Sequence, residues 1–300
     1  MVSTHVVVPI HELTNAAHEV GKGNLDTRLE LKRADEFGPL IDEFNHMVGE
    51  MRDKRVLRQR FGLHVGRRTA DLILAQDPGL SGTEQSVTVM FCDIRNFTAR
   101  CAVTPANEIV PLLNRFLTMM VDVVENRHQG NVNKFLGDGF MALFGIGDQH
   151  SDADSSVDSQ CTGAGQRTGC HHAVNAVSAS LDMIARLDEM NAEYAGTAIP
   201  SLGIGIGIHT GTAIVGSIGS DDRLEYTAIG DTVNLASRVE ALTKTVGEPL
   251  LLTKATSECI AGAFDVRPLE SQSVKGQPDP IAICTVARDG PRRSTSTVPG

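Results

Sequence analysis

The sequence predicts an α+β protein: a ferredoxin-like domain with a βαββαβ core, preceded by a bundle of α-helices. Three observations favour this fold class. Apolar residues recur at helical spacing from the N-terminus to about residue 75, and beyond residue 83 strand-like runs and helical stretches follow one another as βαββαβ. Residues 201–211, "SLGIGIGIHTG", alternate apolar side chains with glycine, which is typical of a strand that something packs against very closely.

Composition fits a folded protein and narrows the range of partners. The 300 residues are 41% hydrophobic and 21% charged, and the formal net charge is −10. This acidic balance gives no support for nucleic-acid binding, which needs a basic face. No run of about 18 apolar residues occurs, and no signal peptide is evident, so nothing here is expected to span a bilayer. The opening "VVVPI" at 6–10 has the character of a stub of a longer apolar segment.

The N-terminal region carries two amphipathic helical patterns. The first has a three-four spacing of Ile10, Leu13, Ala17 and Val20; the second, after a break at 21–38, runs through Phe37, Leu40, Ile41, Phe44, Met47, Val48 and Met51. Stripes this narrow favour helices that seek a partner, and two short helices bury little alone. A dimeric helical bundle is therefore predicted.

This segment, about residues 4–56, resembles a HAMP domain, a linker that carries signals in membrane receptors. The resemblance rests on Pro9 at the start of the first helix, the extended connector, and "DEFG" at 35–38. A generic amphipathic helical hairpin is the alternative. The resemblance implies an upstream sensor and a plasma-membrane anchor in segments preceding residue 1, with the catalytic part in the cytoplasm. Residues 57–82 then form a helical junction that ends at a Pro-Gly break.

The second domain is predicted over residues 83–288. Its expected elements are a strand at 86–94, a helix from Thr104–Pro105 to about 128, strands at 131–135 and 139–144, a helix at 170–194, the strand 201–211, a hairpin around 217–226, a helix at 231–246, and strands near 249–253, 264–274 and 280–287. The polar stretch 145–169 is expected to be a disordered surface insertion, and 289–300 a disordered tail.

The six cysteines form no CxxC pair and are expected to be buried, reduced thiols. Cys161, Cys170, His171 and His172 match no compact zinc pattern, so we do not predict a metal site there.

Two carboxylates stand out in this domain. Asp93 comes at the end of the strand 86–94, and Asp138 lies between two glycines at the tip of the hairpin. In a ferredoxin-like sheet the first strand is adjacent to the central hairpin, so both side chains would meet at one edge. Paired carboxylates repel unless a cation lies between them, and Mg²⁺ suits such ligands. The alternative is a turn residue and an unrelated strand-end residue.

A second polar pair lies on the helix that opens near Asp231. Asn234 and Arg238 are four residues apart and project from one face. An amide beside a guanidinium offers a fixed array of donors, which suits a phosphoryl group that gains negative charge. An ordinary solvated helix face is the alternative.

Four segments occur in order along the domain: "FCDIRNFT", "NKFLGDGFMALFG", "GIGIHTG" and "YTAIGDTVNLASR". Together they resemble the class III nucleotide cyclase catalytic domain, over about residues 84–287. The resemblance implies that Asp93, Asp138 and the backbone carbonyl of Ile94 bind two metal ions, Mg²⁺ or Mn²⁺. It implies that Lys134 and Thr227 read the purine, that Asn234 and Arg238 stabilise the transition state, and that Lys275 holds the triphosphate.

The resemblance further implies an adenylate cyclase, a phosphorus–oxygen lyase that converts ATP to 3′,5′-cyclic AMP and pyrophosphate in signal transduction. In this family the metal ligands come from one subunit and the remaining site residues from the other, so a homodimer is expected. Guanylyl cyclase is the near alternative, disfavoured by Lys134 because guanylyl cyclases carry a glutamate there. A catalytically silent, nucleotide-sensing dimerisation module is the alternative from a different class.

Overall fold

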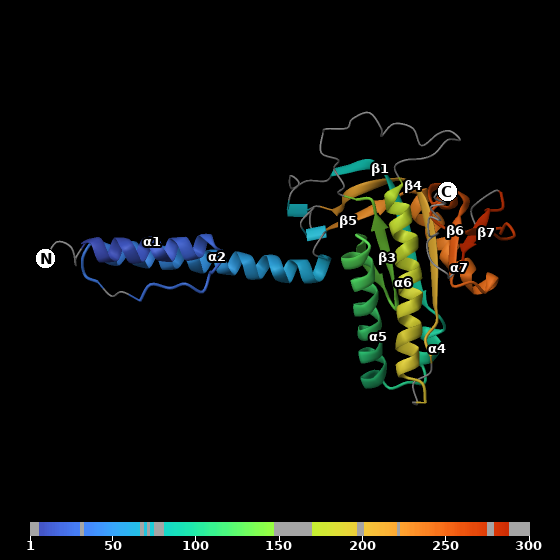
Figure 1. Cartoon of the computed structure of the whole chain (residues 1–300), viewed down its shortest axis with the longest axis horizontal. Coiled ribbons are helices and arrows are strands. Elements are labelled where there is room, and N and C mark those ends of the chain that lie inside the picture. The colour runs from blue at the N-terminus through green and yellow to red at the C-terminus, as the bar shows by residue number, and fades with distance from the viewer. Residues whose placement is uncertain are drawn as a thin grey trace, which may run out of the picture. The chain divides into compact units, whose positions relative to one another are not determined.

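A computed structural model describes residues 6–30, 33–66, 69–70, 73–74, 81–146, 170–196, 201–220, 223–274 and 279–287. The chain divides into two compact units, Met1–Asp71 and Leu72–Gly300, each of which is described by itself (Figure 1). The polar insertion predicted at 145–169 lies almost entirely outside the described residues, and so does the predicted tail at 289–300.

The first unit consists of two helices and a connector. Helix α1 spans Val8–Gly21 with a proline in its first turn, and α2 spans Phe37–Val65. The side chain of Asn45 donates to the carbonyl oxygen of Leu29 and accepts from its backbone amide, both at 2.9 Å. Arg52 Nη2 donates to the carbonyl oxygen of Leu25 at 2.6 Å. These side chains of α2 therefore fasten the extended connector along the helix.

Much of the apolar surface of these two helices is not covered within the unit. Ile41 and Val48 of α2 are buried, but Leu40, Met47 and Met51 are 41–51% exposed. Exposed apolar residues at helical spacing indicate a stripe that needs further helices to cover it. This matches the narrow stripes in the sequence.

The second unit is built on an eight-stranded sheet with the order β2-β3-β1-β4-β6-β8-β7, and β5 pairs with β4. The strands are β1 Ser81–Ile94, β2 Asn131–Leu136, β3 Gly139–Phe144, β4 Ile204–Ser220, β5 Arg223–Ile229, β6 Leu250–Thr253, β7 Val266–Pro268 and β8 Ile283–Val286. The first four strands of the chain lie in the order β2-β3-β1-β4, which is the ferredoxin-like arrangement. The predicted fold class is confirmed.

Helices cover both faces of the sheet, so this unit has three layers. Its longer helical segments are α5 Ala106–Val121, which continues into the π-helical η2 Asp122–Arg127, α6 His171–Glu193 and α7 Asp231–Val246. Met90 and Cys92 of β1 share a buried cluster with residues of α5 and α6. Val87 and Val89 belong to a second cluster that includes Ala236 of α7. The pleat of β1 thus serves two cores, one on each face.

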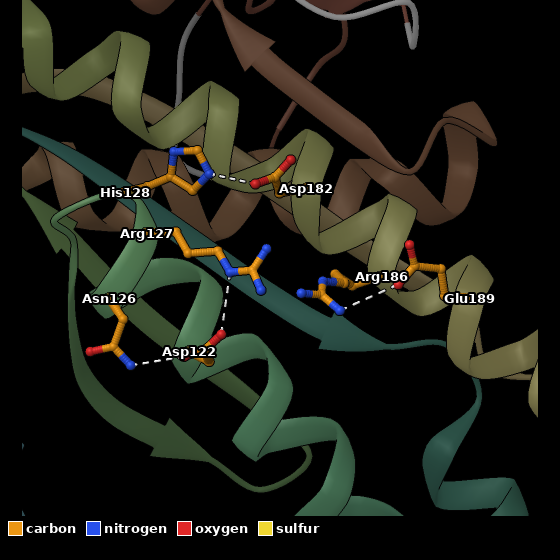
Figure 2. A network of polar contacts seen from close by, with 7 residues as sticks. All are labelled: Asp122, Asn126, Arg127, His128, Asp182, Arg186 and Glu189. Atoms are coloured by element: carbon orange, nitrogen blue, oxygen red, sulfur yellow. Dashed lines mark hydrogen bonds and ion pairs between the residues drawn. The ribbon is translucent and has the colours of Figure 1, made fainter.

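The predicted helix from 105 to 128 is an α-helix followed by a π-helical turn. A polar network connects this turn to α6 (Figure 2). His128 Nε2 lies 2.8 Å from Asp182 Oδ2, and Asn126 Nδ2 and Arg127 Nε contact the Asp122 carboxylate at 2.9 and 3.3 Å. These contacts hold the π-helical turn η2 together and bind its C-terminal end to α6.

Two short helices, α4 Phe97–Cys101 and α8 Lys254–Cys259, were not predicted, since five or six residues carry too little periodicity. The cysteine expectation was partly wrong. The described cysteines are free thiols, but Cys101 is exposed. Cys170 lies 2.9 Å from Cys259, sulfur to sulfur, and no group of three or more metal-ligating side chains occurs in the described part of the chain.

The glycine face of β4 lets α7 approach the sheet closely. A Cβ added at Gly207 would overlap the backbone nitrogen of Glu240 and lie 2.8 Å from the carbonyl oxygen of Ala236. A Cβ at Gly205 would overlap the side chains of Arg95 and Thr243. The close approach predicted from the alternating glycines is confirmed. It brings the polar residues of α7 next to the end of β1, where Asp93 lies.

Candidate functional site

The hairpin between β2 and β3 brings Asp138 to the end of β1. Leu136 pairs with Gly139, which leaves Gly137 and Asp138 as a two-residue turn, and Gly137 has φ of 71°. Cys92 pairs with Phe140 in the neighbouring ladder. A Cβ at Gly139 would overlap the Cys92 carbonyl oxygen and lie 2.9 Å from Asp93 Oδ1. The hairpin tip therefore fits against Asp93 only because residue 139 has no side chain.

The two carboxylates are close enough to influence each other. The pKa of Asp138 is raised, first because the group is partly buried and next because the charge of Asp93 is near. Hydrogen bonds that this carboxylate accepts from the backbone of Asp138 and of Ile94 oppose the rise. Two carboxylates and adjacent backbone oxygens are the donors that a hard divalent cation prefers, and a cation between them would relieve their repulsion. The residues present therefore fit a Mg²⁺ or Mn²⁺ ion.

Charged residues of α7 surround Asp93 within the same chain. Lys244 Nζ lies 3.4 Å from Asp93 Oδ2. Arg95 Nη1 and Glu240 Oε1 form an ion pair at 3.5 Å without hydrogen-bond geometry, and Arg95 Nη2 contacts the Thr243 hydroxyl. The pKa of Glu240 is raised by burial and then by the charge of Asp93. None of these residues was predicted from the sequence as part of the site, although Glu240, Thr243 and Lys244 follow Arg238 on α7.

A second polar cluster joins β2 to β5, two strands that do not pair with each other. Lys134 Nζ lies 2.7 Å from Glu225 Oε2, and this hydrogen bond lowers the pKa of Glu225. The hydroxyl of Thr227 donates to Asn133 Oδ1 at 2.8 Å, and Asn133 Nδ2 donates to the Tyr226 carbonyl oxygen at 2.6 Å. Lys134 and Thr227, which the family resemblance pairs, thus lie in one cluster of a single chain.

Asn133 and Glu225 were not among the site residues predicted from the sequence. Each is one or two residues from a predicted site residue, but nothing in a local pattern shows that β2 faces β5.

Asn234 and Arg238 of α7 make no hydrogen bond or ion pair with either cluster among the described residues. Asn234 is exposed, and Arg238 is half-buried on α7. The Nη1 atom of Arg238 is buried and has no hydrogen-bond partner among the residues that the structure describes. Lys275 lies outside the described residues.

Two family models match the chain. The model of the adenylate and guanylate cyclase catalytic domain matches residues 81–286, and the model of the HAMP domain matches residues 1–53.

Curated relatives match nearly the whole chain. An adenylate cyclase of Anabaena cylindrica is 30% identical over 297 residues, which are 94% of this chain and 54% of the relative. An uncharacterized protein of Mycobacterium tuberculosis strain H37Rv is 33% identical over 281 residues, 92% of this chain and 44% of the relative. The chain therefore spans about half the length of the curated relatives it matches.

Solved structures of both adenylyl and guanylyl cyclases are similar to this chain. The adenylyl cyclase CyaB from P. aeruginosa is 31% identical with a TM-score of 0.57, and covers 69% of this chain and 96% of its own. The guanylyl cyclase Cya2 is 28% identical with a TM-score of 0.57, and covers 72% of this chain and 98% of its own.

Among the described helices, none combines the length and the apolar character that a bilayer crossing requires.

Proposed function

The chain belongs to the adenylate and guanylate cyclase family, and on this premise we propose that it converts ATP to 3′,5′-cyclic AMP and pyrophosphate. The observation that carries the proposal is the arrangement of two separate clusters in one catalytic domain. One is the pair of carboxylates Asp93 and Asp138, and the other joins Lys134 to Thr227 through their neighbours. The first suits metal-bound phosphates, and the second suits a purine base.

The carboxylate pair supplies the site for the reacting phosphate. Two Mg²⁺ or Mn²⁺ ions, held by Asp93, Asp138 and the carbonyl of Ile94, would lower the pKa of the ribose 3′-hydroxyl and neutralise the triphosphate. Arg238 donates to the α-phosphoryl group as its negative charge grows during in-line attack. The buried Nη1 of Arg238, which lacks a partner among the described residues, supports this role.

Two further residues hold the rest of the nucleotide. Asn234 orients the ribose, and Lys275 binds the β- and γ-phosphates that leave as pyrophosphate.

Base recognition favours adenine over guanine. The ammonium of Lys134 carries donors only, so it can bind the unprotonated ring N1 of adenine but not the N1–H of guanine. Thr227 accepts from the 6-amino group of adenine. Glu225 holds Lys134 in place at 2.7 Å.

A homodimer completes the site. No hydrogen bond or ion pair among the described residues joins Asn234 or Arg238 to the carboxylates within one chain, and in the proposed homodimer the two copies would each supply half of two equivalent sites. Apolar side chains of the catalytic unit are available for such an interface, since they are 45–54% exposed: Phe135, Leu136, Ile214, Leu224 and Ile229.

The N-terminal HAMP domain would regulate how the two catalytic domains face each other. Helix α2 continues to Val65, twelve residues beyond the end of the HAMP match at residue 53, and so leads toward the catalytic domain. We assign the HAMP domain to residues 4–56, the junction to 57–82 and the catalytic domain to 83–288. An upstream sensor and a membrane anchor would belong to parts of the protein outside this chain, with the catalytic domain in the cytoplasm.

Guanylyl cyclase activity is the second candidate, because the similar structures include a guanylyl cyclase. The site residues also admit a silent module that binds a nucleotide without turning it over.

A product assay separates these functions. Purified protein is incubated with ATP or GTP and with Mg²⁺ or Mn²⁺, beside the variant Asp138→Ala and the control Asp188→Ala, which alters an exposed carboxylate of α6. We expect cyclic AMP from the wild type and the control, and at least about a hundredfold less from Asp138→Ala, because a ligand of the metal is lost. Cyclic GMP as the main product would favour guanylyl cyclase. No cyclic product with either nucleotide from a folded dimer would contradict the proposed activity.

A further inference from the structure

We propose that Asn133 sets the purine preference of this site by fixing the direction of the Thr227 hydroxyl. Asn133 is a positioning residue, because it acts through Thr227 and not on the nucleotide. The inference rests on the proposed function, since it concerns the base that the same site selects.

The hydrogen bonds around Asn133 leave the Thr227 hydroxyl one orientation. The carbonyl oxygen of Tyr226, 2.6 Å from the side-chain amide of Asn133, can only accept, so the amide nitrogen must face it. The amide oxygen then faces Thr227 Oγ1 at 2.8 Å and can only accept. The hydroxyl proton of Thr227 must therefore point at Asn133.

A hydroxyl has one proton to donate and lone pairs to accept. Because the proton of Thr227 is committed to Asn133, the hydroxyl offers only its lone pairs to a ligand. The 6-amino group of adenine is a donor and can bind these lone pairs of Thr227 Oγ1. O6 of guanine is an acceptor, so it would face the hydroxyl oxygen with no proton to form a hydrogen bond. Without Asn133 the same hydroxyl could rotate and donate to O6.

Burial makes the orientation matter. Thr227 is 6% exposed, so little water is available to satisfy a mismatched acceptor. A site built to bind one polar group rejects a ligand that leaves a buried group unpaired. The preference for adenine thus arises from the hydrogen bond between Thr227 and Asn133, although Asn133 does not contact the nucleotide.

The test measures kcat and KM for ATP and for GTP in the 300-residue chain and in its Asn133→Ala variant. We expect kcat/KM to fall for ATP and to rise for GTP, so that their ratio drops about tenfold or more, mainly through KM. Asn131→Ala, two residues earlier on β2, is the matched control and should leave the ratio unchanged. Thermal melting of each variant shows that it is folded.

Two further variants separate orientation from simple strand fastening. Asn133→Asp keeps an acceptor for the Thr227 hydroxyl but cannot donate to Tyr226, so it should retain the preference for ATP. In a Thr227→Val background no hydroxyl remains to be oriented, so Asn133→Ala should cause no further change in the ratio. Equal losses with both nucleotides in Asn133→Ala, loss of the preference in Asn133→Asp, or additive effects in the Thr227→Val background would each overturn the proposal.

The inference and the proposed function fail in different ways. Binding of 3′-deoxy-ATP and 3′-deoxy-GTP, which lack the attacking hydroxyl, gives the purine preference whether or not turnover occurs. A wild type that makes no cyclic nucleotide but loses its preference for 3′-deoxy-ATP on Asn133→Ala supports the role of Asn133 and contradicts the cyclase activity. A wild type that makes cyclic AMP, with the ratio unchanged in Asn133→Ala, contradicts the role of Asn133 alone.

Discussion

At the scale of single residues, His209 makes folding depend on pH. Its Nδ1 lies 2.8 Å from the hydroxyl of Thr253, and burial lowers its pKa from 6.5 to about 4, with Asp231 opposing the shift. The folded state therefore disfavours the protonated ring. The stability that the neutral ring provides is complete above pH 6.5 and is lost as pH falls from 6.5 toward 4, because the unfolded chain binds the proton first.

We expect His209→Gln to flatten this dependence. The free energy of unfolding of the wild type, from urea titrations at pH 7 and pH 4.5, should drop by more than that of the variant, by up to about 3 kcal/mol from this group. His46→Gln, which alters an exposed histidine, is the control and should behave as the wild type. Equal drops in the wild type and in His209→Gln would show that another group is responsible.

Some residues of the candidate site could be predicted from the sequence and others could not. The adjacency of Asp93 and Asp138 followed from the order of elements, because a ferredoxin-like sheet places the first strand beside the central hairpin. The partners of Lys134 and Thr227 did not follow. Asn133 and Glu225 are 92 positions apart, and their roles depend on how β2 meets β5, which no local pattern encodes.

At the scale of elements, the most demanding contact is the one between β4 and α7. The strand has no side chain at Gly207, where the backbone of Glu240 lies. We expect Gly207→Ala to destabilise the folded domain by about 1–3 kcal/mol or more, since backbone cannot yield as a flexible side chain can. Gly203→Ala is the matched control, because its Cβ would lie 3.4 Å from Arg95, an ordinary contact. Thermal unfolding of both variants measures the difference.

The outcome of that comparison bears on the site as well as on stability. An added Cβ at Gly207 would push α7 away from the sheet. Because Asn234 and Arg238 lie on α7, Gly207→Ala should then also lower activity. A variant with wild-type unfolding would show that α7 can move away freely, contrary to the packing described above.

The bounds of an element were predicted well where clear sequence signals mark both of its ends, and poorly where they do not. The α7 bounds of 231–246 and the β3 bounds of 139–144 agree with the sequence, since apolar spacing and glycine signals delimit both. The strand predicted at 264–274 is only Val266–Pro268, and β4 runs on to Ser220 where the sequence pattern stopped at 211. Strand ends depend on partners along the sheet, which alternation within one segment does not reveal.

At the scale of the whole molecule, the exposed stripe of α2 predicts coupling between assembly and activity. Met47→Glu places a charge among Leu40, Met47 and Met51, which are 41–51% exposed. We expect weaker dimerisation, and hence a specific activity that falls on dilution and recovers at high protein concentration, because a buried charge opposes helix association. Sedimentation and cyclase assays over a dilution series measure both.

The control for this change lies on the same helix. Asp42→Lys alters an exposed residue on the opposite side of α2 from the stripe, and it should leave the dimer and its activity unchanged. If Met47→Glu has no effect on either dimerisation or activity, the N-terminal unit does not hold the catalytic domains together.

The proposed division of each site between two subunits has a consequence for inheritance. In that homodimer, a chain damaged at Asp138 and a chain damaged at Arg238 would each be inactive alone, yet one of each would form a pair with one intact site and one doubly damaged site. In a cell that makes both, random pairing would leave about a quarter of the normal sites. Two loss-of-function alleles would thus complement each other, while either one beside a healthy copy would be only partly dominant.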